Sequence, residues 1–93
     1  MIVKPKFTGR DIQISYLIFD ETFDAIPYIQ SKINTIQETL KSDDIWFDSE
    51  EMTVIKDCIM NRELPNYNYK PEEITAITRE IDRAETEAIL NIP

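Results

Sequence analysis

The residue types that usually carry out catalysis are nearly absent from this chain. Its 93 residues include no histidine, one cysteine and one glycine, and its formal net charge is −8. Without histidine, no side chain has an unperturbed pKa near neutrality, so serine–histidine chemistry is excluded. Cys58 lacks a base to form its thiolate, and Gly9 alone cannot build a phosphate-binding loop. We therefore expect a protein that is not an enzyme and has no cofactor.

Carboxylates are the abundant reactive groups, with 18 Asp and Glu side chains. Two carboxylates can hydrolyse a glycosidic bond, but the reaction needs a sugar-sized cleft, which a small helical bundle rarely provides. The acidic segment 43–51 is rich in oxygen ligands, yet it lacks the alternating spacing and central glycine of a calcium loop. One thiol and no imidazole disfavour zinc. We predict no metal site.

The charge is unevenly distributed along the chain. Residues 1–19 hold three basic and one acidic side chain, whereas residues 20–93 hold 17 acidic and 7 basic ones. Such an excess repels phosphate backbones and anionic lipid headgroups, which disfavours direct nucleic-acid or membrane-surface binding. It attracts basic proteins over long range. A basic protein partner is therefore the class of partner that the composition favours.

The strongest concentration of acid lies in residues 43–57, which hold six acidic side chains and one lysine. Trp46 and Phe47 lie inside this segment. Tryptophan is enriched among binding hot spots, whereas Phe47 fits the core position next to a helix start. For Trp46, a binding role and a role in closing the end of a bundle both stay open. The predicted partner-binding residues are Asp43, Asp44, Trp46, Asp48, Glu50 and Glu51.

Other features of the chain have a simpler interpretation beside the functional one. For the acidic side chains, the simpler interpretation is that they form a solvated face that keeps the protein soluble. Glu73, Glu80 and Glu87 recur every seven residues and would lie along one stripe of a helix. Tyr69 fits a structural position before a helix, while Tyr67 is free to contact a partner.

Three segments carry helix-start signals. Thr8 with Asp11 and Asp48 with Glu51 have the spacing of a capping box, and Pro71 fits the first position of a helix. Apolar residues at intervals of three and four follow these starts and mark amphipathic helices. The predicted elements are an extended arm at 1–7 and helices near 9–22, 24–41, 49–62 and 71–90.

Three local predictions depend on weaker signals. Residues 12–19 alternate as in a strand, but they also have helical spacing, and the chain offers no second strand to pair with them. Pro27 lies either in the first turn of a helix capped by Asp24 or at a kink. The basic arm, with Lys4 and Lys6, is expected to be disordered, although it could pair with the protein's own carboxylates or with a second copy.

These patterns predict an all-α protein, a compact three- or four-helix bundle in a single domain spanning 1–93. A lone cysteine, the lack of a secretory signal and the lack of a long apolar run predict a cytoplasmic protein. We expect a protein-binding module, an inhibitor or regulator whose acidic helical surface docks on a basic, nucleic-acid-binding site and so acts as a DNA mimic. Two alternatives stay open: a structural subunit that forms a homodimer or larger homo-oligomer, and an immunity-type neutraliser of a basic toxin.

Overall fold

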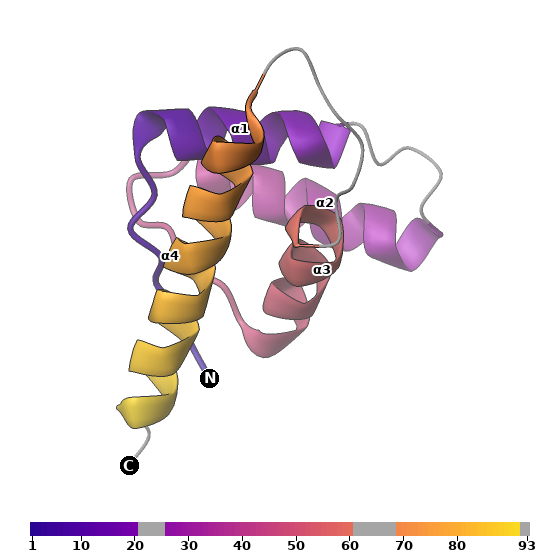
Figure 1. Ribbon diagram of the computed structural model, residues 1–93. Helices are drawn as coiled ribbons and strands as arrows, with labels where there is room; N and C mark the ends of the chain where they lie inside the picture. The colour runs from indigo at the N-terminus through magenta and orange to yellow at the C-terminus, as the bar shows by residue number, and fades with distance from the viewer. Residues whose placement is uncertain (21–25, 61–68, 92–93) are drawn as a thin grey trace.

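The computed structural model describes residues 1–20, 26–60 and 69–91. Within them lie four helices: α1 (Gly9–Asp20), α2 (Pro27–Leu40), α3 (Ser49–Ile59) and α4 (Pro71–Leu90). The predicted all-α, bundle-like fold is confirmed (Figure 1). Residues 12–19 belong to α1, so the helical interpretation of that segment is correct. An isolated antiparallel bridge joins Val3 to Phe47.

Local hydrogen bonds fix two of the helix starts as predicted. At α1, the Asp11 amide donates to Thr8 Oγ1 at 3.1 Å, and the Thr8 amide donates to Asp11 Oδ2 at 3.0 Å. At α3, the Glu51 amide donates to Asp48 Oδ1 at 2.8 Å, and the Asp48 amide donates to Glu51 Oε1 at 3.1 Å. Each capping box satisfies two backbone donors that a bare helix end leaves without partners.

The start of α2 differs from the prediction. Ile26 is extended, with φ −60° and ψ 155°, and the helix begins at Pro27 rather than at residue 24. The cause is local, because proline disfavours the helical conformation in the residue before it. Asp24 lies outside the described residues, as does the predicted end of the first helix at 22. α3 ends at Ile59, with Met60 as its C-cap. The predicted end of this helix at residue 62 lies outside the described residues.

An isoleucine-rich core joins the four helices. Each helix contributes two isoleucines to it, and all eight are at most 2% exposed: Ile14, Ile18, Ile33, Ile36, Ile55, Ile59, Ile77 and Ile81. Ile26 is 64% exposed because it precedes the helix. Burial of an isoleucine side chain contributes about 1.5–3 kcal/mol, so these residues dominate the stability of the fold.

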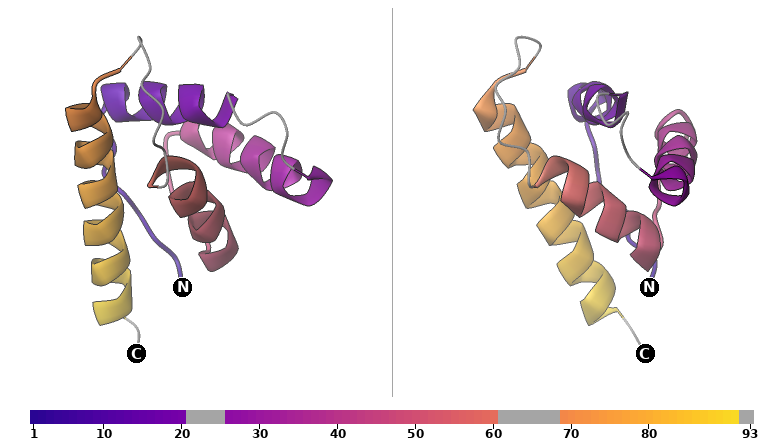
Figure 2. Two further views of the ribbon diagram at one scale, coloured as in Figure 1. Left: turned by 45° about the vertical axis from the view of Figure 1, so that its right-hand side comes forward. Right: turned by 90° about the vertical axis from the view of Figure 1, so that its right-hand side faces the viewer.

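The N-terminal arm is extended, as predicted, but the expectation that it is disordered is wrong. The amides of Val3 and Phe47 each donate to the other residue's carbonyl oxygen at 2.9 Å, and both side chains are fully buried. Pro5 is also buried, and the Lys6 amide donates to Glu80 Oε2 at 3.1 Å. The arm runs along α4 in two views, and its start lies near the last turn of α4 (Figures 1 and 2). Burial of Val3 and Pro5 supplies the stabilisation that a polar tail would lack.

Candidate protein-binding surface

The connection between α2 and α3 carries most of the predicted site. Phe47 points into the core, and the backbone around it is paired with Val3 on the arm. Neighbouring residues in extended backbone point to opposite sides. Trp46, on one side of Phe47 in the sequence, is accordingly 43% exposed. The burial of Phe47 confirms its predicted core role, and it holds Trp46 at the surface.

Asp43 and Asp44 are the exposed, unneutralised part of the connection. Both side chains are exposed, and neither carboxylate has an ion pair or side-chain hydrogen bond within the described residues. The Ser42 hydroxyl oxygen lies 2.7 Å from the Thr39 carbonyl oxygen and 2.9 Å from that of Asp44. This hydroxyl therefore helps fix the backbone while leaving both carboxylates facing solvent.

Glu50 has partners on the neighbouring helix. Lys32 Nζ lies 2.9 Å from Glu50 Oε2, and the Tyr28 hydroxyl donates to the same oxygen at 3.0 Å. The hydrogen bonds from Lys32 and then from Tyr28 lower the pKa of Glu50, and the hydrogen bond to Glu50 raises the pKa of Lys32. The charge of Glu50 is thus largely offset. The same contacts bring Tyr28 beside the start of α3.

Asp48 and Glu51 form the capping box of α3. Glu51 is only 7% exposed, and Asp48 is half-buried. The structure therefore places four of the six predicted partner-binding residues at the surface and keeps Glu51 beneath it. We define the acidic surface as Asp43, Asp44, Trp46 and Glu50.

Tyr28 was missed by the sequence analysis. It is 57% exposed, and its ring centroid lies 5.8 Å from Lys32 Nζ. The hydrogen bond to Glu50 is the main cause of its raised pKa, and the Asp48 charge adds a smaller effect. Pro27 was the available signal, because a helix that begins there places Tyr28 in its exposed first turn, off the apolar face that contains Ile33 and Ile36.

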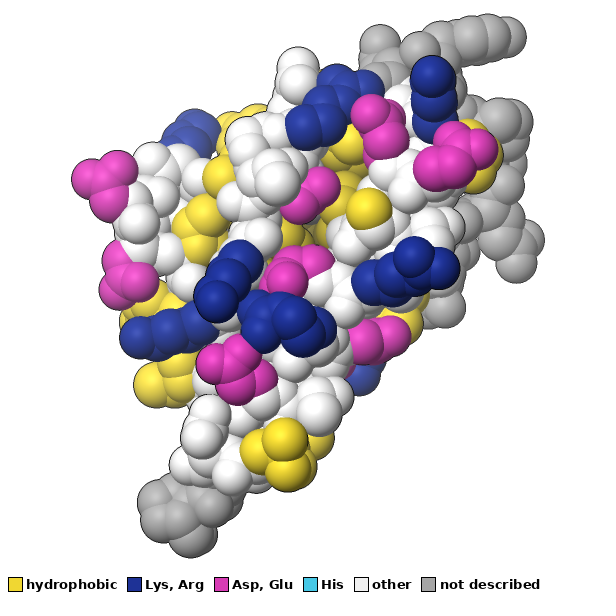
Figure 3. Space-filling view, turned by 60° about the vertical axis from the view of Figure 1, so that its left-hand side comes forward, with side chains coloured by type: hydrophobic (Ala, Val, Ile, Leu, Met, Phe, Trp, Pro, Cys, Tyr) yellow, Lys and Arg dark blue, Asp and Glu magenta, His cyan; other side chains and the backbone are white. Residues whose placement is uncertain are grey.

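The glutamate stripe on α4 has internal partners. Arg10 holds Glu73 through two contacts of 3.1 Å, and Arg83 holds both Glu80 and Glu87. The hydrogen bonds from these arginines are the largest cause of the lowered pKa of Glu73 and of Glu80. Dark blue and magenta side chains alternate on this face in Figure 3. Glu73 and Glu80 therefore link α4 to α1 and to the arm, whereas Asp43 and Asp44 remain unneutralised.

The described residues offer little else on which to build a site. They contain no group of three or more His, Cys, Asp and Glu side chains placed to hold a metal ion. None of their helices has the length and apolar character needed to span a membrane. Tyr69 is 7% exposed, in agreement with its predicted structural role, and Tyr67 lies outside the described residues.

Comparison with protein families, with curated proteins and with solved structures found no match to this chain.

Proposed function

We propose that this protein is a non-enzymatic protein-binding module that docks its acidic surface on a basic protein partner. The observation that carries the proposal is the exposure of Asp43 and Asp44, without internal partners among the described residues, beside a half-exposed Trp46. Three glutamates of α4, Glu73, Glu80 and Glu87, are held by arginines of the same chain. The contrast supports an external partner for the acidic surface.

The chemistry of the surface suits arginine above other groups. A guanidinium ion can form two parallel hydrogen bonds to a carboxylate and can also stack on an indole ring. Asp43 and Asp44 would supply the charge, and Trp46 would bury apolar area at the centre of the contact. Because Lys32 already offsets Glu50, this residue would contribute less than the two aspartates.

The same chemistry defines the proposed biological role. A site built to bind the negative charge of DNA, about one charge per 1.7 Å of helix axis, would also attract this surface. The module would then act as an inhibitor or regulator of a nucleic-acid-binding protein, as a DNA mimic in the cytoplasm. A basic toxin is the other partner that this surface would fit, and identification of the partner separates the two roles.

Charge reversal at the acidic surface tests the proposal. The variant Asp43→Lys/Asp44→Lys should lose at least about tenfold in affinity for a 12-residue peptide of repeated Arg-Leu-Gly, since exposed ion pairs contribute ~0.2–1 kcal/mol each and reversal adds repulsion. The matched control Glu72→Lys/Asp82→Lys makes the same change in net charge at exposed residues of α4. It should retain most of the affinity. Equal losses in the two variants would show that only the net charge matters.

Ionic strength provides a second readout of the same contact. Affinity of the unmodified protein for the peptide should fall steadily as sodium chloride is raised from 50 to 500 mM, because salt screens exposed charges. An affinity that does not change over this range would contradict an electrostatic interface.

A further inference from the structure

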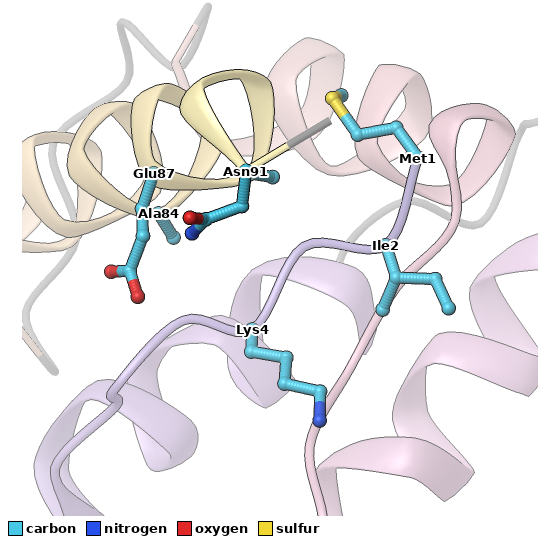
Figure 4. A pocket seen from close by; sticks show the side chains of 7 residues that line it. Met1, Ile2, Lys4, Ala84, Glu87 and Asn91 are labelled. Carbon is cyan, nitrogen blue, oxygen red and sulfur yellow. The ribbon is translucent and has the colours of Figure 1, made fainter. Parts of the chain in front are cut away.

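The exposed side of the N-terminal arm lies beside the acidic surface. Val3 and Phe47 are paired through two backbone hydrogen bonds, and both of their side chains are buried. The residues next to each of them in the chain therefore point to the opposite, outer side. In this antiparallel pairing Lys4 is opposite Trp46, and Ile2 is a diagonal neighbour of Trp46. Figure 4 shows the Ile2 and Lys4 side chains leaving the arm on the same side.

Ile2 extends the apolar part of this surface. Its side chain is 57% exposed, and that of Trp46 is 43% exposed. Diagonal neighbours on paired segments lie about 7–8 Å apart, which is within reach of an aromatic side chain. The two side chains therefore offer adjoining apolar area, and a partner that contacts Trp46 from the arm side would cover Ile2 as well.

Lys4 gives the charge of this surface a direction. Its side chain is exposed, and its ammonium group has no ion pair within the part of the chain that the structure describes. A cation of the partner is attracted by Asp43 and Asp44 on one side of Trp46 and repelled by Lys4 on the other. The surface is thus acidic at the connection before α3, and it is apolar with one positive charge at the arm.

This order of charges indicates the chemistry of the partner. A partner site made of cations alone would place positive charge against Lys4 and would leave Ile2 uncovered. A segment whose arginines are followed by an apolar side chain is complementary to both parts of the surface. We propose that the arm is the second half of the partner-binding surface and that its occupant is a basic, amphipathic segment of the partner. Arginine contacts the two aspartates, and an apolar side chain covers Trp46 and Ile2. This inference rests on the proposed function and adds the class of segment that the surface recognises.

Two peptides of equal length and charge test the apolar half of the surface. Isothermal titration calorimetry compares 12-residue repeats of Arg-Leu-Gly and of Arg-Ser-Gly. The leucine peptide should bind the unmodified protein about tenfold more tightly, because its apolar side chains are removed from water in the contact. The substitution Ile2→Ser should weaken binding of the leucine peptide by at least about threefold and leave that of the serine peptide unchanged within about twofold. Its helical circular dichroism should not change, because Ile2 is exposed.

Leu90→Ser is the matched control for the apolar contact. Leu90 is 79% exposed, and it lines a hollow on α4 whose walls include no residue of the arm. The affinity of this variant for both peptides should equal that of the unmodified protein.

Lys4→Gln tests the direction of the charge. It should raise the affinity for both peptides by about threefold, because it removes a positive charge beside Trp46. Arg79→Gln makes the same change in net charge at an exposed residue of α4 and should raise the affinity less. Equal rises in the two variants would contradict a local effect of Lys4.

The outcomes separate this inference from the proposed function. Equal affinity of the unmodified protein for the two peptides would overturn the inference, and so would equal losses in Ile2→Ser and Leu90→Ser. The proposed function would stand after either result if Asp43→Lys/Asp44→Lys still weakens binding of both peptides. Absence of binding by both peptides would overturn the proposed function and this inference together.

Discussion

The pairing of Val3 with Phe47 predicts that the N-terminal arm controls the stability of the acidic surface. Val3 is fully buried, and its backbone exchanges two hydrogen bonds of 2.9 Å with Phe47. The substitution Val3→Ala removes two methyl groups from the core and leaves the backbone pairing possible. At about 0.8 kcal/mol for each buried carbon, the lost transfer free energy is about 1.6 kcal/mol. The cavity that remains adds to this, so we expect a loss of about 2–3 kcal/mol.

Urea unfolding followed by circular dichroism measures this loss. A domain of this size has a free energy of unfolding of about 5–14 kcal/mol, so the variant should still fold and should unfold at a lower urea concentration with an unchanged slope. The control Ile26→Ala removes more apolar atoms from a side chain that is 64% exposed and should cost less than about 0.5 kcal/mol.

Hydrogen exchange connects the loss of stability to the surface. In the Val3→Ala variant, the Phe47 amide should exchange faster by the factor that corresponds to the measured change in free energy, because its protection depends on the paired arm. A change in stability below about 0.5 kcal/mol would refute the claim that the arm belongs to the core. A stability loss without faster exchange at Phe47 would refute the claim that the arm secures the acidic surface.

Two further predictions concern the capping box and the glutamate stripe. The substitution Asp48→Ala should cost about 1 kcal/mol and lower the midpoint of thermal unfolding by about 4–8 °C, because the Glu51 amide loses its acceptor; an unchanged midpoint would show that the cap is not needed. The pKa of Glu80 is lowered from 4.5, first by hydrogen bonds from Arg83, so the folded protein binds fewer protons there than the unfolded chain does. Its stabilising effect is therefore complete above about pH 5 and is lost as the pH falls through the lowered pKa of the folded state. The urea midpoint of the unmodified protein should fall over this pH range. The Glu80→Gln variant should have a lower free energy of unfolding than the unmodified protein at pH 7, and the difference between the two should narrow in acid. A difference that does not change with pH would contradict a stabilising role for the Glu80 carboxylate.

Local signals in the sequence predicted the helices because the relevant partners are three or four residues apart. The Thr8–Asp11 and Asp48–Glu51 capping boxes are such contacts, and both form as expected. The error at the start of α2 was also local, since the effect of Pro27 on Ile26 is a property of neighbouring residues.

The long-range contacts could not be predicted in this way. Val3 and Phe47 are 44 positions apart, and nothing in either local segment indicates that their backbones pair. The spacing of Glu73 and Glu80 revealed the stripe, but its partners Arg10 and the Lys6 amide lie at the other end of the chain. The sequence therefore identified charged residues without showing which charges are neutralised internally.

That distinction decides how the candidate surface is interpreted. Composition alone does not distinguish the α4 glutamates from the acidic residues of segment 43–51 as candidates for binding a partner. In the structure the stripe glutamates Glu73, Glu80 and Glu87 are paired and Glu51 is buried in its cap, whereas Asp43 and Asp44 keep unneutralised charge at the surface. A smaller acidic surface thus remains, and its aromatic neighbour is Trp46.

Amide chemical-shift mapping with the Arg-Leu-Gly peptide tests the central claim most directly. We expect the largest shifts at residues 43–50 and at the Trp46 indole N–H, and we expect the Asp43→Lys/Asp44→Lys variant to lose them. Shifts centred on α4, or shifts of equal size in that variant, would contradict the claim that this surface recognises basic proteins.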